Sequence, residues 1–430
     1  MMKQLYFKTL LIAVLIISAT GIVLSQNYEA SKTLTKSKGV PADVIIDISN
    51  HSGDIRCNTT NDNTASIQTE IHVSAKSEED ANKIIKAIEN FEFKLKGNVL
   101  HIDTRFYRNM QSNNSRTILT LLNGDKVRIR DFKIKHELNI PKTADLKLHN
   151  KYSNVFLESL EGEAFLNLYS SKLTAGNFEQ ETTIDSKYSK LQIENFNNRC
   201  ALNLYDTDIR FKTASDLEIT SKYSKVEGNK AGKLNIDSYD DKVFINEFSD
   251  LKLEAKYSDL TSEAVLDKLV LDLYDSNVKI SSAKSGGFNG KYSDLKLGDV
   301  KELKITESYD NNVYLGKTMN VSIAQSKYSK YELGSNSKFE LTGYDDDVEI
   351  NELNSDFAGI SMDGKYSKLE LDAGSVPFKV DFKMKYGKVD IPETVNLTKH
   401  IEKNSEKEML SNDSGAAIVV RGYDMKVVIR

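Results

Sequence analysis

Tyrosine is the most frequent aromatic residue in this chain of 430 residues, and it recurs at regular intervals. One series lies in the tripeptide Lys-Tyr-Ser and comprises Tyr152, Tyr188, Tyr223, Tyr257, Tyr292, Tyr328 and Tyr366, with a Lys-Tyr-Gly variant at Tyr386. The second series alternates with the first and comprises Tyr169, Tyr205, Tyr239, Tyr274, Tyr309 and Tyr344. In all but its first member, an aspartate follows the tyrosine.

These tyrosines admit two interpretations. Rings packed on consecutive repeats would stabilise the fold by about 0.5 to 1.5 kcal/mol per pair. An exposed row would instead offer flat apolar faces with polar tips, which could bind a glycan or a peptide. The absence of tryptophan weakens the glycan version. The residues therefore form a structural ladder or a ligand-facing stripe.

Carboxylates cluster beside the second series and could supply oxygen ligands to calcium. The clusters are Asp206 with Asp208, Asp240 with Asp241, and Asp345 to Asp347. No glycine-rich calcium repeat accompanies them, and lysines such as Lys187, Lys222 and Lys256 recur in the other series. Solvated charge is the simpler interpretation. Calcium binding would predict a large rise in melting temperature on addition of calcium.

The sequence indicates no catalytic site. The histidines are His51, His72, His101, His136, His149 and His400, and none lies in the array beyond its first strand at His149. Some β-solenoids cleave polysaccharides with carboxylates and Lys or Arg, so the fold type alone does not exclude an enzyme. A catalytic site would be expected to interrupt the repeat. In this chain, however, Asp and Lys recur with the same period as the tyrosines. We therefore predict a protein that is not an enzyme and has no cofactor.

Merging the two tyrosine series gives a repeat of mostly 16 to 19 residues, such as the 17 residues from Tyr188 to Tyr205. Apolar residues alternate with polar ones ahead of each tyrosine, as at Leu251 and Leu253 before Tyr257, which is typical of half-buried strands. Such units are too short for a strand and a helix. We predict an all-β fold, a single-stranded β-solenoid of about 17–18-residue repeats over residues 146–396.

Fourteen such coils, stacked at roughly 4.8 Å, would form a rod about 65 Å long. A turn that holds both series in roughly 35 residues, or a flat sheet of hairpins, stays open. The tyrosine lies one residue earlier between its flanking apolar positions in the second series than in the first. Because neighbouring residues of a strand point to opposite faces, we expect the two series to point in different directions.

The ends of the array differ from the repeats. In residues 26–145 we predict a β-rich cap with one amphipathic helix from Ser77 to Phe91, whose apolar face holds Ala81, Ile84, Ile85 and Ile88. The tripeptide at residues 123–125, Asn-Gly-Asp, predicts a β-hairpin, and the polar segment 107–116 predicts a mobile loop. Residues 397–430 predict a C-terminal cap or final coil, which would cover an exposed strand edge.

Composition and termini bear on location and partners. A net charge of -5 offers no basic field for nucleic acid. Lys3 and Lys8 precede a mostly apolar run from Leu10 to Leu24, so residues 1–25 predict a cleaved signal peptide, with an uncleaved membrane anchor as the alternative. Cys57 and Cys200 are interpreted as structural, although a disulfide between them stays open.

The layout resembles the "putative adhesin" family of bacterial β-strand-repeat (β-solenoid) proteins of unknown function. The features that carry the resemblance are the turn at residues 50–55, Asn-His-Ser-Gly-Asp-Ile, the helix at Ser77 to Phe91, the strand end at residues 138–141 and the repeated units after it. This chain has Tyr-Ser or Tyr-Asp where the repeats of that family more often show Ser-Gly-Asp. The resemblance implies a role at the cell envelope or surface, and it implies no catalytic residue.

From these observations we expect an exported, non-catalytic, adhesin-like or scaffolding protein of the cell envelope. Its partner would be an envelope or cell-surface glycan or protein, and the location would be the periplasm, the outer surface or the medium. One alternative is a glycan-binding or polysaccharide-degrading β-helix. The other is a periplasmic sensor or component of an envelope-stress response.

Overall fold

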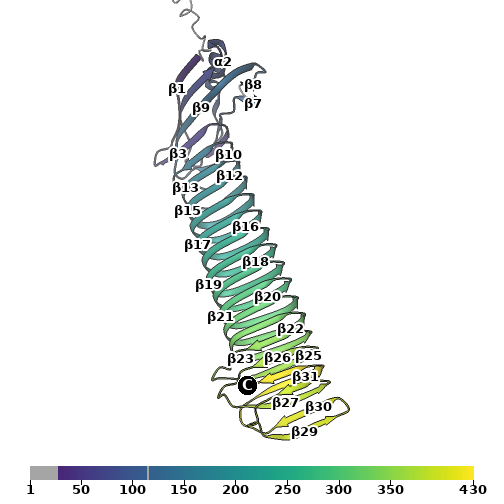
Figure 1. Ribbon diagram of the computed structural model, residues 1–430. Coiled ribbons are helices and arrows are strands. Elements are labelled where there is room, and N and C mark those ends of the chain that lie inside the picture. Colours follow the sequence, from purple (N-terminus) through teal and green to yellow (C-terminus); the bar gives the residue numbers. More distant parts are fainter. Residues whose placement is uncertain (1–27, 114–115) are drawn as a thin grey trace, which may run out of the picture.

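The computed structural model describes residues 28–113 and 116–430, which form a rod of stacked β-coils (Figure 1). The expected signal peptide, residues 1–25, lies outside the described residues. The regular strands are β10 (Asp145–Lys151), β11 (Asn154–Leu157), β12 (Ala164–Tyr169), β13 (Lys172–Phe178), β14 (Thr182–Lys187), β15 (Lys190–Tyr205), β16 (Asp208–Lys222), β17 (Lys225–Tyr239), β18 (Lys242–Lys256), β19 (Asp259–Tyr274), β20 (Asn277–Lys291), β21 (Asp294–Tyr309), β22 (Asn312–Lys327), β23 (Lys330–Tyr344), β24 (Asp347–Ile350), β25 (Gly359–Lys365) and β26 (Lys368–Leu371).

Every pairing within this array is parallel, and each tyrosine unit makes one turn of the solenoid. Asp208 lies beside Lys225, and Lys225 lies beside Lys242, so the chain advances 17 residues per coil there. The stack contains about 13 turns of roughly 18 residues. The predicted solenoid and its repeat length are thus confirmed. A turn of about 35 residues and a flat sheet of hairpins are both excluded.

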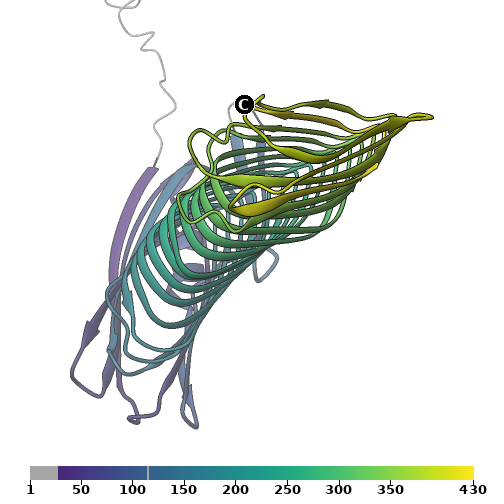
Figure 2. The same cartoon turned by 90° about the horizontal axis from the view of Figure 1, so that it is seen from below.

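Each coil has two arms that enclose a thin core between them. In β18, Val243, Ile245 and Phe248 point inward from the first arm, and Leu251 and Leu253 point inward from the second. The alternation of buried and exposed residues follows from the pleat of a strand, and each buried side chain rests on its counterparts in the neighbouring coils. Seen along the rod, the coils lie one behind another (Figure 2).

The stack begins earlier than the first tyrosine unit. The N-terminal elements are β1 (Tyr28–Gly39), β2 (Ile45–His51), β3 (Asp54–Thr60), β4 (Thr64–Ala75), α2 (Glu78–Glu89), β5 (Glu92–Lys96), β6 (Val99–Asp103), β7 (Tyr107–Asn113), β8 (Arg116–Leu121) and β9 (Lys126–Pro141). Strands β2 and β3 form a coil that pairs in parallel with β10 and β11. Strand β9 then continues the sheet beside β3, followed by β4 and β1.

The predicted amphipathic helix is confirmed as α2. The hydroxyl of Ser77 caps it by accepting the N–H of Asp80 at 3.2 Å. Its buried face, which includes Ile84 and Ile88, belongs to the same apolar cluster as Ile71 of β4 and Val127 of β9. The helix therefore covers the sheet at the N-terminal end of the rod.

Strands β8 and β9 form the predicted hairpin around residues 123–125. The predicted loop at residues 107–116 is wrong: β7 is a strand that pairs antiparallel with β8. Although β7 is polar, its backbone pairs with β8 along one edge, and its first residue, Tyr107, is buried.

The C-terminal end departs from sequential order. Its strands are β27 (Phe378–Lys385), β28 (Lys388–Asp390), β29 (Leu397–Lys403), β30 (Glu406–Ser411), β31 (Ala416–Tyr423) and β32 (Lys426–Ile429). The last coil, β31 with β32, lies between the coil of β25 and β26 and that of β27 and β28 (Figure 1). Strand β30 pairs antiparallel with the other side of β27, and β29 pairs with β30.

Candidate functional site

The tyrosines of both series, joined by Tyr423 and Tyr386, form one continuous row along an edge of the rod. Centroids of adjacent rings lie 5.2–5.8 Å apart, and the ring planes meet at 67–82°. This edge-to-face geometry is favoured by the ring quadrupoles. We call the row the tyrosine ladder; in spatial order it consists of Tyr152, Tyr169, Tyr188, Tyr205, Tyr223, Tyr239, Tyr257, Tyr274, Tyr292, Tyr309, Tyr328, Tyr344, Tyr366, Tyr423 and Tyr386.

The expectation that the two series point in different directions is wrong, and the turn geometry explains why. Tyr239 is the last residue of its strand, whereas Tyr257 stands one position later, in the turn itself. Tyr257 has φ 58°, and this left-handed conformation returns its ring to the row. Its ring centroid lies 5.4 Å from that of Tyr239. A one-residue shift and a change in the sign of φ thus bring both series to one edge.

The left-handed turn position alternates between tyrosine and aspartate. Asp240 has φ 55° and Asp275 has φ 47°, while the tyrosines of the first series have φ between 56° and 60°. Aspartate and asparagine tolerate this conformation, but other L-residues adopt it at a cost of about 1–2 kcal/mol each. Every second coil therefore carries a tyrosine where a smaller residue would be less strained.

A buried polar row beneath the turns fixes their geometry. The backbone N–H of Ser224 donates to Oδ1 of Asp241 at 2.7 Å, and the N–H of Asp241 donates to Oγ of Ser258 at 3.1 Å. The N–H of Ser258 donates to Oγ of Ser276 at 3.1 Å, and the pattern continues through Ser293. Each side chain thus satisfies the turn of the preceding coil, which holds consecutive turns in register.

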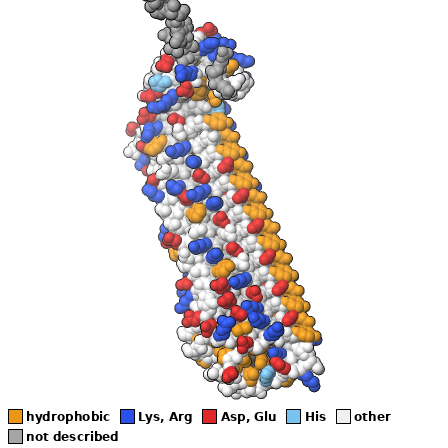
Figure 3. Space-filling view, in the orientation of Figure 1, with side chains coloured by type: hydrophobic (Ala, Val, Ile, Leu, Met, Phe, Trp, Pro, Cys, Tyr) orange, Lys and Arg blue, Asp and Glu red, His pale blue; other side chains and the backbone are white. Residues whose placement is uncertain are grey.

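The ladder is half exposed and forms a single apolar stripe (Figure 3). The first-series rings are the more exposed, for example 47% at Tyr223 against 39% at Tyr274. Partial burial, with nearby tyrosines and Asp240, raises the pKa of Tyr223, so the hydroxyls stay neutral at physiological pH. The stripe therefore presents ring faces and edges together with neutral hydroxyl tips to the solvent.

Opposite charges flank the stripe. In one column, lysine alternates with second-series tyrosine, so that Lys222 lies beside Tyr239 and Tyr239 beside Lys256. In the adjacent turn column, aspartate alternates with first-series tyrosine. Acidic side chains accordingly accompany the stripe at regular intervals in Figure 3. The nitrogen of Lys222 lies 5.6 Å from the ring centroid of Tyr239, within reach of a cation–π contact.

The aspartate clusters separate into two environments. Asp240 lies in the exposed turn column, but its neighbour Asp241 is buried and accepts hydrogen bonds from Ser221 and Ser238. Asp345 and Asp346 divide in the same way, and Ser326 donates to Asp346 at 2.7 Å. Within residues 28–113 and 116–430, no group of three or more acidic, His or Cys side chains is placed to hold a metal ion.

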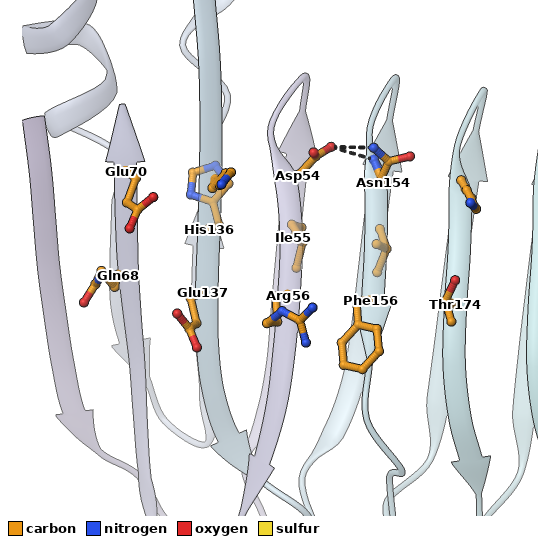
Figure 4. A pocket seen from close by; sticks show the side chains of 13 residues that line it. Asp54, Ile55, Arg56, Gln68, Glu70, His136, Glu137, Asn154, Phe156 and Thr174 are labelled. Carbon is orange, nitrogen blue, oxygen red and sulfur yellow. Dashed lines mark hydrogen bonds between the residues drawn. The ribbon is translucent and has the colours of Figure 1, made fainter. Parts of the chain in front are cut away.

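A second candidate is a shallow hollow of about 550 Å³ on the outer face of β4, β9, β3, β11 and β13 (Figure 4). Asp54 accepts two hydrogen bonds from Asn154 there, and the guanidinium of Arg56 lies 4.2 Å from the ring centroid of Phe156. His136 is buried and bonded to Thr69 at 2.9 Å, and burial lowers its pKa to about 4. The imidazole of His136 is thus neutral at physiological pH, and its Nδ1 is already hydrogen-bonded to Thr69.

Sequence reasoning omitted three rings from the row. Tyr423 lies between Tyr366 and Tyr386, the Lys-Tyr-Gly variant of the first series, and its Tyr-Asp pattern could have identified it. His51 and Tyr107 extend it at the N-terminal end, where His51 lies 5.2 Å from Tyr152 and 4.7 Å from Tyr107 by ring centroids. No repeat pattern marks those two.

Both cysteines are buried free thiols, in agreement with their structural interpretation. Burial raises the pKa of Cys57 to about 12 and that of Cys200 well above its ordinary value. Neither thiol is therefore a candidate nucleophile. Among the helices of the described residues, none is long and apolar enough to cross a membrane.

No known protein family and no curated protein matches the sequence. Solved structures that are similar to the chain include three bacterial proteins. A putative adhesin from Bacteroides fragilis is 14% identical with a TM-score of 0.28, over 64% of this chain and 97% of that one. A putative adhesin from Parabacteroides distasonis is 13% identical with a TM-score of 0.19, over 79% and 96%.

A putative cell adhesion protein from Clostridium sporogenes is 10% identical with a TM-score of 0.16, over 94% of this chain and 99% of that one. These names agree with the family that the sequence resembles. At such identities and TM-scores the likenesses carry no argument about activity or partners. The β-solenoid itself rests on the strand pairings of this chain.

Proposed function

We propose that this protein is an exported, non-catalytic, adhesin-like rod of the cell envelope that binds a partner along the tyrosine ladder. The observation that carries the proposal is the apolar stripe that runs along one edge of the stack (Figure 3). Contiguous exposed apolar surface is uncommon on soluble proteins and marks interaction sites. Tyrosine is also enriched at such sites, because its ring supplies contact area at little entropic cost.

The backbone strain of the first series supports a binding role over a purely structural one. Asp240 and Asp275 occupy the same turn position with less strain than Tyr257. The ring contacts of each first-series tyrosine are similar in size to this strain, so stability alone does not select tyrosine there, and strained positions that persist are often tied to function. The tyrosines that carry the strain are also the more exposed of the two series.

The first test is location. Intact cells are treated with an impermeant protease, and the mature chain is followed by blotting beside a periplasmic control protein. Loss of the chain with an intact control is the expected result for an adhesin-like rod. Full protection would contradict surface display and would favour a periplasmic partner.

The second test is binding. Purified residues 26–430 are applied to envelope polysaccharides and to whole cells, and retention is compared with that of a triple variant, Tyr223→Asn, Tyr257→Asn and Tyr292→Asn. A matched control carries Phe244→Asn, Leu266→Asn and Met319→Asn, which are similarly exposed but lie off the ladder. The proposal expects at least tenfold weaker retention for the ladder variant alone. Equal loss in both variants, or cleavage of the polysaccharide, would contradict it.

A further inference from the structure

We propose that the partner of the tyrosine ladder is a second copy of this chain, so that two rods associate side by side, in parallel, ladder against ladder. This inference rests on the proposed binding role of the ladder and names its occupant. Three properties of the stripe carry it: its area, the arrangement of its flanking charges and its form as a ridge.

The area is sufficient for a stable dimer. An aromatic side chain presents about 150–250 Å², and the most exposed ladder rings are 36–54% exposed. The row therefore offers on the order of 1,000 Å² per copy. A specific interface typically buries about 800 Å² on each partner. Contact along most of the ladder would thus reach the size of a stable interface without any other surface.

The flanking charges are complementary to themselves in only one orientation. Two rods that face each other and run in the same direction place the lysine column of each copy against the aspartate column of the other. Two rods that run in opposite directions place lysine against lysine and aspartate against aspartate. Displacement of one rod by a single coil sets each lysine directly opposite an aspartate and each tyrosine opposite a tyrosine. Charge therefore selects the parallel pair.

These charges are available to a partner except at Lys291, whose side-chain nitrogen lies 3.4 Å from a carboxylate oxygen of Glu307. Within the described part of the chain, neither Asp206, Asp240 and Asp275 nor Lys187, Lys222 and Lys256 take part in an ion pair. Both columns repeat every second coil, about 9.6 Å along the rod. Because a second copy has the same spacing between its charges, each lysine of one rod stays opposite an aspartate of the other along the whole interface.

The ladder is also a projecting edge. It follows the tight turns of the coils, and the hollow of about 550 Å³ lies instead on a sheet face beside Asp54 (Figures 3 and 4). A small ligand prefers a concave site that surrounds it, whereas two straight ridges can contact each other along their length. The geometry thus favours a second rod over a short glycan.

The test begins with the oligomeric state of residues 26–430 by sedimentation velocity across a range of concentrations. A dimer is expected, with a dissociation constant that rises at least tenfold in the variant Tyr223→Asn, Tyr257→Asn, Tyr292→Asn. The off-ladder control Phe244→Asn, Leu266→Asn, Met319→Asn should dimerise normally. Far-ultraviolet circular dichroism verifies that each variant is folded.

Charge reversal tests the facing columns. One variant carries Lys187→Asp, Lys222→Asp and Lys256→Asp, and the other carries Asp206→Lys, Asp240→Lys and Asp275→Lys. Long side chains fit the turn position, since tyrosine occupies it on alternate coils. Each variant alone should dimerise at least tenfold more weakly, and a mixture of the two should recover affinity to within about threefold of the wild type. A mixture that stays monomeric would overturn the charge argument.

Cross-linking tests the direction of the rods. Tyr152→Cys and Tyr386→Cys lie at opposite ends of the ladder, and the native thiols of Cys57 and Cys200 are buried and do not compete. Oxidation should join two copies of Tyr152→Cys, or two copies of Tyr386→Cys, but not one of each. Cross-links only between opposite ends would overturn the parallel arrangement.

The outcomes separate this inference from the proposed function. A monomer at all concentrations whose ladder still binds cells or polysaccharide would overturn the inference and leave the proposed function intact. A ladder-dependent dimer that is fully protected in intact cells would support the inference and contradict surface display.

Discussion

At the scale of single residues, the stabilisation by ring contacts in the ladder is opposed by the cost of left-handed backbone in the first series. Tyr257 contacts the rings of Tyr239 and Tyr274 but occupies the left-handed region, whereas Tyr274 has two ring contacts and an extended backbone. Each ring contact contributes about 0.5–1.5 kcal/mol, and the left-handed conformation costs about 1–2 kcal/mol. The two effects are therefore of similar size and can be separated by substitution.

We predict that Tyr274→Asn destabilises the protein by about 1–2 kcal/mol more than Tyr257→Asn, because only Tyr257→Asn relieves left-handed strain. Both variants lose two ring contacts in adjacent coils, so they are matched controls for each other. Urea denaturation followed by circular dichroism measures the difference. Equal losses would mean that the tyrosine turn is not strained.

Asp346 provides a pH-dependent contribution to stability. Burial raises its pKa to about 6, although it accepts hydrogen bonds from Ser326, Ser329 and Tyr344. The folded state therefore holds a proton that the unfolded chain releases near pH 4. This contribution is fully present below pH 4 and declines as the pH rises to about 6.

In the wild type, Asp346 should lower the free energy of unfolding by up to about 3 kcal/mol as the pH rises from 4 to 6. We predict that this decrease is absent in Asp346→Asn. Asparagine fits this row, since Asn311 occupies the equivalent position and its Oδ1 accepts the N–H of Ser293 at 2.9 Å. The control is Asp345→Asn, in the exposed turn. Denaturation at a series of pH values measures the effect, and an unchanged pH profile in Asp346→Asn would contradict it.

At the scale of elements, the intercalated C-terminal coil closes the rod. Strand β31 pairs with β25 on one side and β27 on the other, so it must enter after both neighbours are present or be assembled together with them. Repeat proteins are held together by contacts between neighbouring coils. The end of the rod therefore depends on one short segment that arrives last in the sequence.

We predict that Val420→Asp opens the end of the rod without unfolding its centre. Val420 is fully buried in β31, and a charge there would lose its water without gaining a partner. Hydrogen exchange should rise across residues 359–390 and stay unchanged in β16 to β20. The adjacent Val419→Asp is the control, since Val419 points away from the core. Exchange that rises throughout the rod would contradict the prediction.

At the scale of the whole molecule, the rod is built from nearest-neighbour contacts, and its smallest repeat is a pair of coils. One coil of each pair presents Lys and Tyr at the turn, and the other presents Tyr and Asp. Removal of a pair leaves the alternation of rings and charges intact. Removal of a single coil places two aspartate turns side by side and interrupts the ladder.

We predict that deletion of residues 242–276, which spans two coils, gives a shorter rod with nearly unchanged thermal stability. Deletion of residues 242–258, a single coil, should lower the melting temperature and reduce the near-ultraviolet circular dichroism of the tyrosines. The first deletion joins Asp241 to Asn277 and the second joins it to Asp259, both at matching register. Equal melting temperatures for the two deletions would mean that the alternation is not important.

Local patterns in the sequence predicted the repeated strands, a repeat unit of about 17–18 residues, the helix at Ser77 and the hairpin at residues 123–125, but they left open whether one turn of the solenoid holds one unit or two. These features depend on period-2 alternation, on a repeated tyrosine unit and on capping or turn residues, which act between neighbours in the chain. The export signal, the absence of catalysis and the envelope role stay predictions.

Only the tertiary structure decided that both tyrosine series share one edge and that the last coil lies between two earlier ones. The first depends on the positive φ of residues such as Tyr257, which the buried hydrogen bonds between turns impose. The position of the last coil depends on which strands β31 pairs with, and several strands of the rod have the same alternating pattern. Sequence periodicity specifies which residues face the core, but it does not specify which coil lies next to which.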